Sequence, residues 1–127
     1  MTTKTKNSIA WVLTVLLAFA FAGSGITKLL GVEMQIKNLQ SWGYPLWLRF
    51  PIGLFEIAFA IALLIPKFRL VTIYGVFAWT IVAVITHLQA GQANMIVPSL
   101  LFSVIAGVII LLTKEKQQIN QFKSKVA

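Results

Sequence analysis

The stretch that most constrains this chain runs from Leu46 to Ile65, which is about 20 residues long and almost wholly apolar. A helix of that length matches the ~30 Å hydrocarbon core of a bilayer at ~1.5 Å per residue. Its two charged residues, Arg49 and Glu56, are seven positions apart and therefore share one helix face. Glu56 lies near the middle of the span, where a carboxylate is costly unless it is protonated or paired. We therefore expect Glu56 to face protein rather than lipid.

Three further apolar runs are long enough to cross a membrane. Only 11% of the residues are charged, whereas a soluble domain would carry about 25%. The sequence therefore predicts an all-α integral membrane protein, a four-transmembrane-helix bundle that forms a single membrane domain over residues 1–127. The predicted spans lie at approximately 9–30, 46–65, 70–88 and 96–112, with polar tails at 1–8 and 113–127.

The first apolar run also has features of a cleaved signal peptide. A basic start precedes it, and Ala-Phe-Ala occurs at 18–20 and again at 20–22. The run continues beyond both positions to Leu30, which favours a membrane span. Its small residues favour close packing against another helix.

The loop between the first two spans has a pattern of its own. Val32, Ile36 and Leu39 follow helical spacing, which predicts a short interfacial helix lying on the membrane surface. Trp42 and Trp47 lie where the chain re-enters the bilayer, as residues of an aromatic belt do.

Basic residues gather on one side of the predicted bundle. Four spans place both termini on the same side, and that side carries eight of the 11 Lys and Arg residues: Lys4, Lys6, Lys67, Arg69, Lys114, Lys116, Lys123 and Lys125. By the positive-inside rule both termini lie in the cytoplasm, and we expect the protein in a bacterial cytoplasmic membrane. The location of basic residues on the cytoplasmic side thus accounts for the net charge of +8, and no nucleic-acid partner is expected.

The composition also limits the chemistry of the chain. It contains no cysteine, which excludes disulfides, iron–sulfur clusters and Cys-ligated zinc for this chain alone. One histidine and one mid-membrane glutamate are too few ligands for a metal site. No complete catalytic constellation is present, so whether the protein is an enzyme stays open.

Depth along the predicted spans groups the polar residues into two levels. Counting ~1.5 Å per residue from the cytoplasmic ends places Glu56, Trp79 and Ser103 near the midplane, with Thr80 beside them. The same count places the basic residues Lys28, Arg49 and His87 ~10 Å farther from the cytoplasmic side. We predict a polar pocket open toward the outer leaflet, and its candidate residues are Lys28, Arg49, Glu56, Trp79, Thr80, His87 and Ser103.

Each candidate also has a purely structural interpretation. Lys28 and Arg49 have the positions of residues that snorkel to the headgroups, and His87 that of an interfacial histidine with satisfied hydrogen bonds. Trp79 has the position of a core residue. If the pocket exists, it suits an amphipathic ligand with polar oxygens, such as a quinone or a lipid headgroup.

Five short motifs together resemble those of a known family: Gly25-Ile-Thr-Lys28-Leu, Gly43-Tyr-Pro45, Gly53-Leu-Phe-Glu56, Leu63-Leu-Ile-Pro66 and Ala83-Val-Ile-Thr-His87. In order and spacing, from about Ala22 to Leu112, they resemble the DoxX-like family of small four-helix membrane proteins. The resemblance implies a four-span bundle with Lys28, Glu56 and His87 at the family's polar positions. It also implies a link either to quinone-coupled oxidation or to the assembly of membrane proteins. Arg49 matches no motif of the family.

Two functions of different classes follow. The first is a quinone- or lipid-interacting subunit of a membrane redox complex, with no covalently bound cofactor and a redox centre supplied by a partner protein. The alternative is a non-enzymatic membrane scaffold or assembly chaperone that holds another membrane protein or a second copy of itself. A carrier or proton path through Glu56 is the weakest hypothesis, because no predicted helix is broken.

Overall fold

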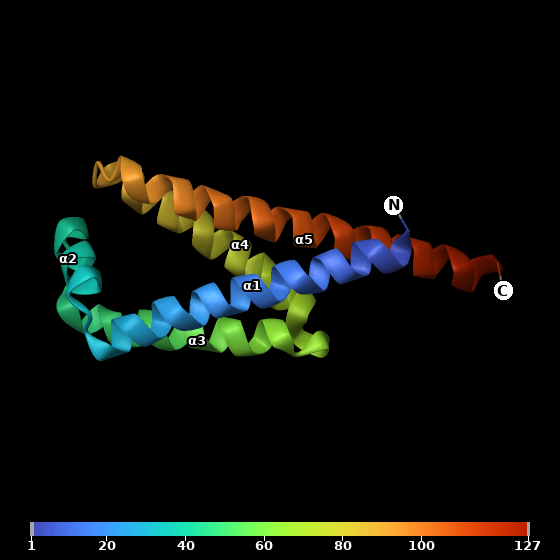
Figure 1. The fold of residues 1–127 in the computed structure, drawn as a ribbon, viewed down its shortest axis with the longest axis horizontal. Helices are drawn as coiled ribbons and strands as arrows, with labels where there is room; N and C mark the ends of the chain where they lie inside the picture. The colour runs from blue at the N-terminus through green and yellow to red at the C-terminus, as the bar shows by residue number, and fades with distance from the viewer. Residues whose placement is uncertain (1, 127) are drawn as a thin grey trace.

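The structure is a computed structural model that describes residues 2–126, with the side chains of residues 115 and 116 outside the description. The described chain is helical and contains no strand (Figure 1). Its elements are α1 (Thr3–Leu30), α2 (Glu33–Trp42), the 3-10 turn η1 (Leu46–Leu48), α3 (Arg49–Leu64), α4 (Pro66–Gln89) and α5 (Ala93–Val126). The predicted all-α fold is confirmed.

The four long helices run alternately in opposite directions (Figure 1). Helix α1 packs most closely against α3 and α4 against α5, and the two pairs meet through contacts of α1 with α5 and of α3 with α4. Within the described chain, the backbones of the diagonal partners α1 and α4 stay apart, with no Cα atoms within 8 Å of each other, and so do those of α3 and α5; side chains still meet across the α1–α4 diagonal. Both termini lie at one end of the bundle, and α2 lies across the opposite end (Figure 1).

Among residues 2–126, four helical segments are long and apolar enough to cross a membrane, namely Thr3–Leu30, Leu46–Leu64, Pro66–Gln89 and Ala93–Val126. Large apolar side chains cover their outer faces, where they match the hydrocarbon of a bilayer. Phe19, Val71 and Leu111 are examples, at 74%, 78% and 68% exposed. These features confirm the prediction of an integral membrane helix bundle.

The helices extend beyond the predicted spans. Helix α5 continues to Val126, through most of the expected polar tail, because no glycine or proline follows Leu112. Helix α4 begins at Pro66 rather than near residue 70, since proline is well tolerated in a first helical turn. Helix α1 begins at Thr3, where the Thr2 hydroxyl oxygen accepts a hydrogen bond from the Thr5 amide at 3.1 Å.

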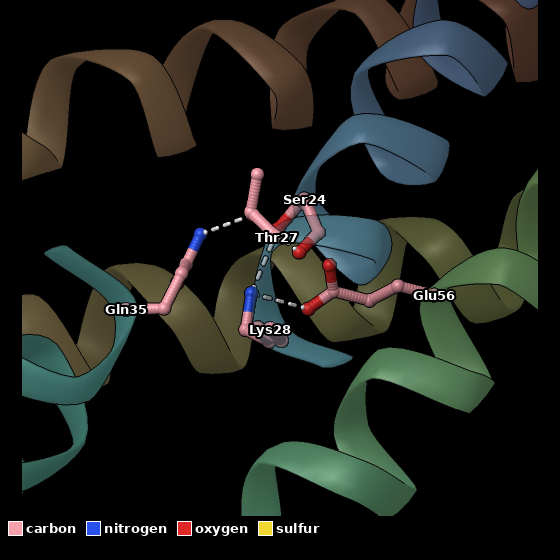
Figure 2. A network of polar contacts seen from close by, with 5 residues as sticks. All are labelled: Ser24, Thr27, Lys28, Gln35 and Glu56. Atoms are coloured by element: carbon pink, nitrogen blue, oxygen red, sulfur yellow. Dashed lines mark hydrogen bonds and ion pairs between the residues drawn. The ribbon is translucent and has the colours of Figure 1, made fainter. Parts of the chain in front are cut away.

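The expected short helix in the first loop is α2. It lies between Gly31 and Gly43, whose φ angles of 71° and 75° let the chain leave the preceding helix in a left-handed conformation. Two of its residues face the bundle. Leu39 is fully buried. Gln35 points its side-chain amide toward α1 (Figure 2). The location of α2 on a membrane surface stays a prediction.

The hydrophobic core fills the half of the bundle nearer the termini. Its buried members come from all four long helices and include Leu17, Leu63, Ile73, Val76 and Ile109. The other half, beneath α2, holds most of the buried polar side chains. The fold therefore places a stable apolar half next to a polar half.

Candidate functional site

The polar half is built around a close crossing of α1 and α3. A Cβ atom placed on Gly25 would lie 2.6 Å from the Gly53 carbonyl oxygen, and one on Gly53 would lie 2.8 Å from the Gly25 carbonyl oxygen. Any larger residue would push the two backbones apart. These two glycines therefore set the distance between the helices that carry Lys28 and Glu56.

Lys28 and Glu56 form a buried ion pair at this crossing (Figure 2). Lys28 Nζ lies 2.9 Å from Glu56 Oε1, with the two side chains 9% and 6% exposed. The ammonium group also donates a hydrogen bond to Ser24 Oγ at 2.7 Å. A buried lysine is thus compensated by one carboxylate and one hydroxyl.

Helix direction explains why the pair meets. Lys28 and Glu56 each follow one of the crossing glycines by three residues, which on antiparallel helices separates their backbone levels by roughly 9 Å. Side chains on a helix lean toward its N-terminus, so these two lean toward each other. The sequence-based depths are therefore compatible with the backbone. Depth alone puts the Lys28 backbone about 10 Å farther out than that of Glu56, and the direction of its side chain is what lets it reach the carboxylate.

One oxygen of this pair has no partner. Glu56 Oε2 is buried and has no hydrogen bond with any described atom. Figure 2 shows it turned away from Lys28. Buried polar atoms are nearly always hydrogen-bonded, so an orphaned carboxylate oxygen marks a place where a donor is missing.

Helix α2 is tied to α1 by a second polar contact. Gln35 Nε2 donates to Thr27 Oγ1 at 2.9 Å, and Thr27 Oγ1 in turn donates to the Ser24 carbonyl oxygen at 2.9 Å (Figure 2). The contact fixes one side of α2 over the ion pair.

The other side of α2 is tied to the turn between α4 and α5. Trp42 Nε1 donates to Gln92 Oε1 at 2.7 Å, and His87 Nδ1 lies 2.8 Å from the same oxygen. An indole N–H can only donate, so Gln92 must present its carbonyl oxygen, and His87 Nδ1 must carry a proton. In neutral His87 the remaining ring nitrogen, Nε2, is then an acceptor.

These elements enclose a pocket of about 280 Å³ beneath α2, at the end of the bundle opposite the termini. Five of the seven predicted site residues line it: Lys28, Glu56, Trp79, Thr80 and His87. The prediction missed further polar and aromatic lining residues, which are Phe21, Ser24, Gln35, Asn38, Trp42, Tyr44, Thr86, Ser99 and Phe102.

The pocket lining does not include Arg49 or Ser103. The Arg49 guanidinium lies over the Phe50 ring at 4.4 Å and against Gly31, outside the pocket. Ser103 is buried one turn beyond the lining, where its hydroxyl donates to the Ser99 carbonyl oxygen at 3.0 Å. Arg49 and Ser103 were predicted because they lie at the same depths as the lining residues, but their side chains do not point into the pocket.

The missed residues left a partial signal in the sequence. Gln35, Asn38 and Trp42 follow i, i+3, i+7 spacing, which puts them on one face of α2. That face lines the pocket. Gln92 left no such signal, because its partner Trp42 is 50 residues away.

The aromatic wall of the pocket is ordered by ring contacts. Trp79 packs edge-on against Phe59 with ring centroids 5.6 Å apart, and Trp42 packs edge-on against His87 at 5.4 Å. Thr80 donates its hydroxyl hydrogen to the Phe77 carbonyl oxygen at 2.8 Å. Within residues 2–126, no three His, Cys, Asp or Glu side chains that the structure describes are grouped as metal ligands would be.

Comparison with known proteins agrees with this architecture. The model of the DoxX-like family matches residues 12–112, a range that contains the motifs noted in the sequence and nearly all of the four long helices outside the C-terminal extension. Searches of curated proteins and of solved structures gave no match. Because the family match covers most of the sequence, the chain belongs to the DoxX-like family.

Proposed function

We propose that the protein binds the polar head of a quinone in the pocket beneath α2, as a subunit of a membrane redox complex. The observation that carries the proposal is Glu56, which lines this pocket in a membrane-spanning bundle and whose buried Oε2 atom has no hydrogen-bond partner among the described atoms. A hydroxyl group of a bound ligand would supply the missing donor.

The other polar groups of the pocket complement both redox forms of such a ligand. Lys28 has three N–H donors, of which Glu56 and Ser24 engage two, so one remains for a carbonyl oxygen. Neutral His87 offers Nε2 as a further acceptor for a hydroxyl. A quinone presents carbonyl oxygens and a quinol presents hydroxyl groups, so either form finds a partner.

The size and lining of the pocket fit the ring of a quinone. Its volume of about 280 Å³ is close to the lower limit of about 300 Å³ for small-molecule sites, which suits a head group rather than a long isoprenoid chain. Trp42, Tyr44 and Trp79 supply aromatic surface for an apolar ring. The tail would leave along the apolar lining residues toward the lipid.

The redox centre would belong to a partner. The chain has no cysteine, and its described residues hold no cluster of metal ligands, so the electrons of a bound quinol would pass to another subunit. By the distribution of basic residues, the termini would lie in the cytoplasm and the pocket would face the outer leaflet.

The scaffold alternative finds less support. A scaffold would present small residues on its outer surface for another helix to approach. Gly25 and Gly53, which make the close helix contact, instead face each other inside the bundle, although Gly23 is open on the outer face of α1. Binding of a membrane protein partner without quinone would nevertheless favour the scaffold.

The proposal can be tested by quinone titration of the purified protein in mild detergent. Quinones quench tryptophan fluorescence at short range, and Trp42 and Trp79 line the pocket while Trp11 and Trp47 do not. We expect saturable quenching by a short-tailed quinone. Ala83 lines the pocket and Ala78 is exposed on the same helix, so Ala83→Phe should abolish the saturable quenching and Ala78→Phe should retain it.

Two results would contradict the proposal. One is quenching that rises linearly with quinone concentration, as partition into the micelle would produce. The other is equal saturable quenching in Ala83→Phe and Ala78→Phe, which would place the quinone elsewhere on the protein.

A further inference from the structure

A second buried cation lies at the opposite end of the bundle from the pocket. Arg69, in the first turn of α4, is 8% exposed, and its Nη1 atom is buried without a hydrogen-bond partner among the described atoms. Its guanidinium carbon lies 4.7 Å from the centre of the Trp11 ring. Stacking on the indole holds the guanidinium plane in place while leaving an N–H donor unused.

Arg69 lines a small cavity between α1, α4 and α5. The cavity has a volume of about 10 Å³, which is close to the least that can hold one water-sized atom. Polar residues of α1 and α5 line it together with Arg69, among them Thr3, Lys6, Asn7 and Thr113. It therefore admits a single oxygen atom next to a buried cation.

The charges at this end favour an anion. Lys67 and Lys114 are exposed at the same end, while the described carboxylates of Glu33 and Glu56 pair with lysines at the other end. The third carboxyl residue, Glu115, has its side chain outside the description, and the experiment below includes it. A guanidinium with a free N–H donor, at an end of the bundle that carries exposed lysines, is the kind of group that recognises phosphate.

We propose that Arg69 binds a phosphate group, with one phosphate oxygen entering the cavity and accepting a hydrogen bond from Nη1. The phosphate belongs either to the headgroup of an anionic lipid or to a free phosphate ion. The site is independent of the quinone pocket, from which the apolar core separates it.

The test compares thermal unfolding of the purified protein in detergent micelles that contain phosphatidylglycerol, phosphatidylcholine or neither. Inorganic phosphate forms a separate arm. We expect phosphatidylglycerol to raise the unfolding temperature of the parent protein more than phosphatidylcholine does. Arg69→Gln should weaken the apparent affinity for phosphatidylglycerol about tenfold or more, because a hydrogen bond to a charged group is lost.

Two matched variants separate a specific site from general attraction. Lys67→Gln removes the same charge two residues away at an exposed position, and it should weaken the affinity by no more than about fivefold. Arg69→Lys keeps the charge but loses the planar fork, so an intermediate affinity is expected. Should Arg69→Gln fail to fold, Arg69→Lys and the headgroup comparison on the parent still decide.

Each outcome of these experiments either identifies the source of the phosphate group or contradicts the proposal. Stabilisation by inorganic phosphate at millimolar concentration identifies a free anion as the ligand, whereas stabilisation by phosphatidylglycerol alone identifies a lipid headgroup. Equal stabilisation by both lipids with no effect of phosphate would overturn the proposal, as would equal losses of affinity in Arg69→Gln and Lys67→Gln. A Glu115→Gln variant that reproduces Arg69→Gln in every arm would also overturn it, because the partner of Arg69 would then be a carboxylate.

Discussion

Replacing Glu56 by glutamine should destabilise the protein, because it leaves Lys28 buried without a counter-charge. The amide is nearly the same size as the carboxylate, and its oxygen can still accept a hydrogen bond from Lys28 Nζ. The charge is therefore the main difference. The lysine keeps its hydrogen bond to Ser24 and remains only 9% exposed.

The expected loss can be estimated from the geometry. Removing one partner of a buried ion pair costs about 3–5 kcal/mol when the remaining charge has nothing else to bind. A retained hydrogen bond to a charged group is worth about 1.5–3 kcal/mol. We therefore expect Glu56→Gln to lower the free energy of unfolding by about 2 kcal/mol.

The chain offers a matched control. Glu33 Oε1 lies 2.9 Å from Lys37 Nζ, the same distance as in the buried pair, but these side chains are 80% and 70% exposed. Glu33→Gln should change the free energy of unfolding by no more than about 0.5 kcal/mol. Unfolding is followed by titration with a denaturing detergent, for both variants and for Lys28→Met/Glu56→Gln.

The double variant tests the cause. Removing the lysine as well removes the uncompensated charge, so the double variant should be more stable than Glu56→Gln alone. If Glu56→Gln is as stable as the parent, or if the double variant is less stable than Glu56→Gln, the ion pair is not what holds Glu56 in place. Quinone titration of the same variants then shows whether quinone affinity falls by more than the loss of folded protein explains.

Two further predictions concern packing and orientation. Gly25→Ala should lower the free energy of unfolding by about 1–3 kcal/mol, because its Cβ would meet the backbone of α3, whereas Gly23→Ala, with nothing within 4 Å, should leave it unchanged or slightly raised. Equal unfolding free energies for the two variants would contradict the proposed helix contact. A phosphatase that is active only in the periplasm should stay inactive when fused to Ala127, and strong activity would reverse the predicted orientation.

The fold could be predicted because its signals are local. Each long apolar run is long enough to span a bilayer, and the spacing of Val32, Ile36 and Leu39 predicted α2. The ends of the helices were harder to predict from the sequence. The residues after Leu112 form the polar tail, and because nothing in them stops a helix, they continue α5 rather than leave it at Leu112.

The site was only partly predictable, because depth along a helix does not give the direction of a side chain. Glu56, Thr80 and His87 were placed by depth and line the pocket, whereas Arg49 and Ser103 have the right depth and point elsewhere. The direct pairing of Lys28 with Glu56 depends on two side chains leaning toward opposite ends. The Trp42–Gln92 contact joins residues 50 positions apart, which no local pattern reveals.

The contact of Gly25 with Gly53 has a mechanical consequence for the pocket. With no side chain between their backbones, α1 and α3 have little room to slide or separate, so we expect them to move together. Any widening of the pocket must then come from α4 and α5 swinging away from these two helices. The hydrogen bond between Trp42 and Gln92 connects α2 to the α4–α5 turn. This hydrogen bond must therefore break before α4 and α5 can move away from α1 and α3.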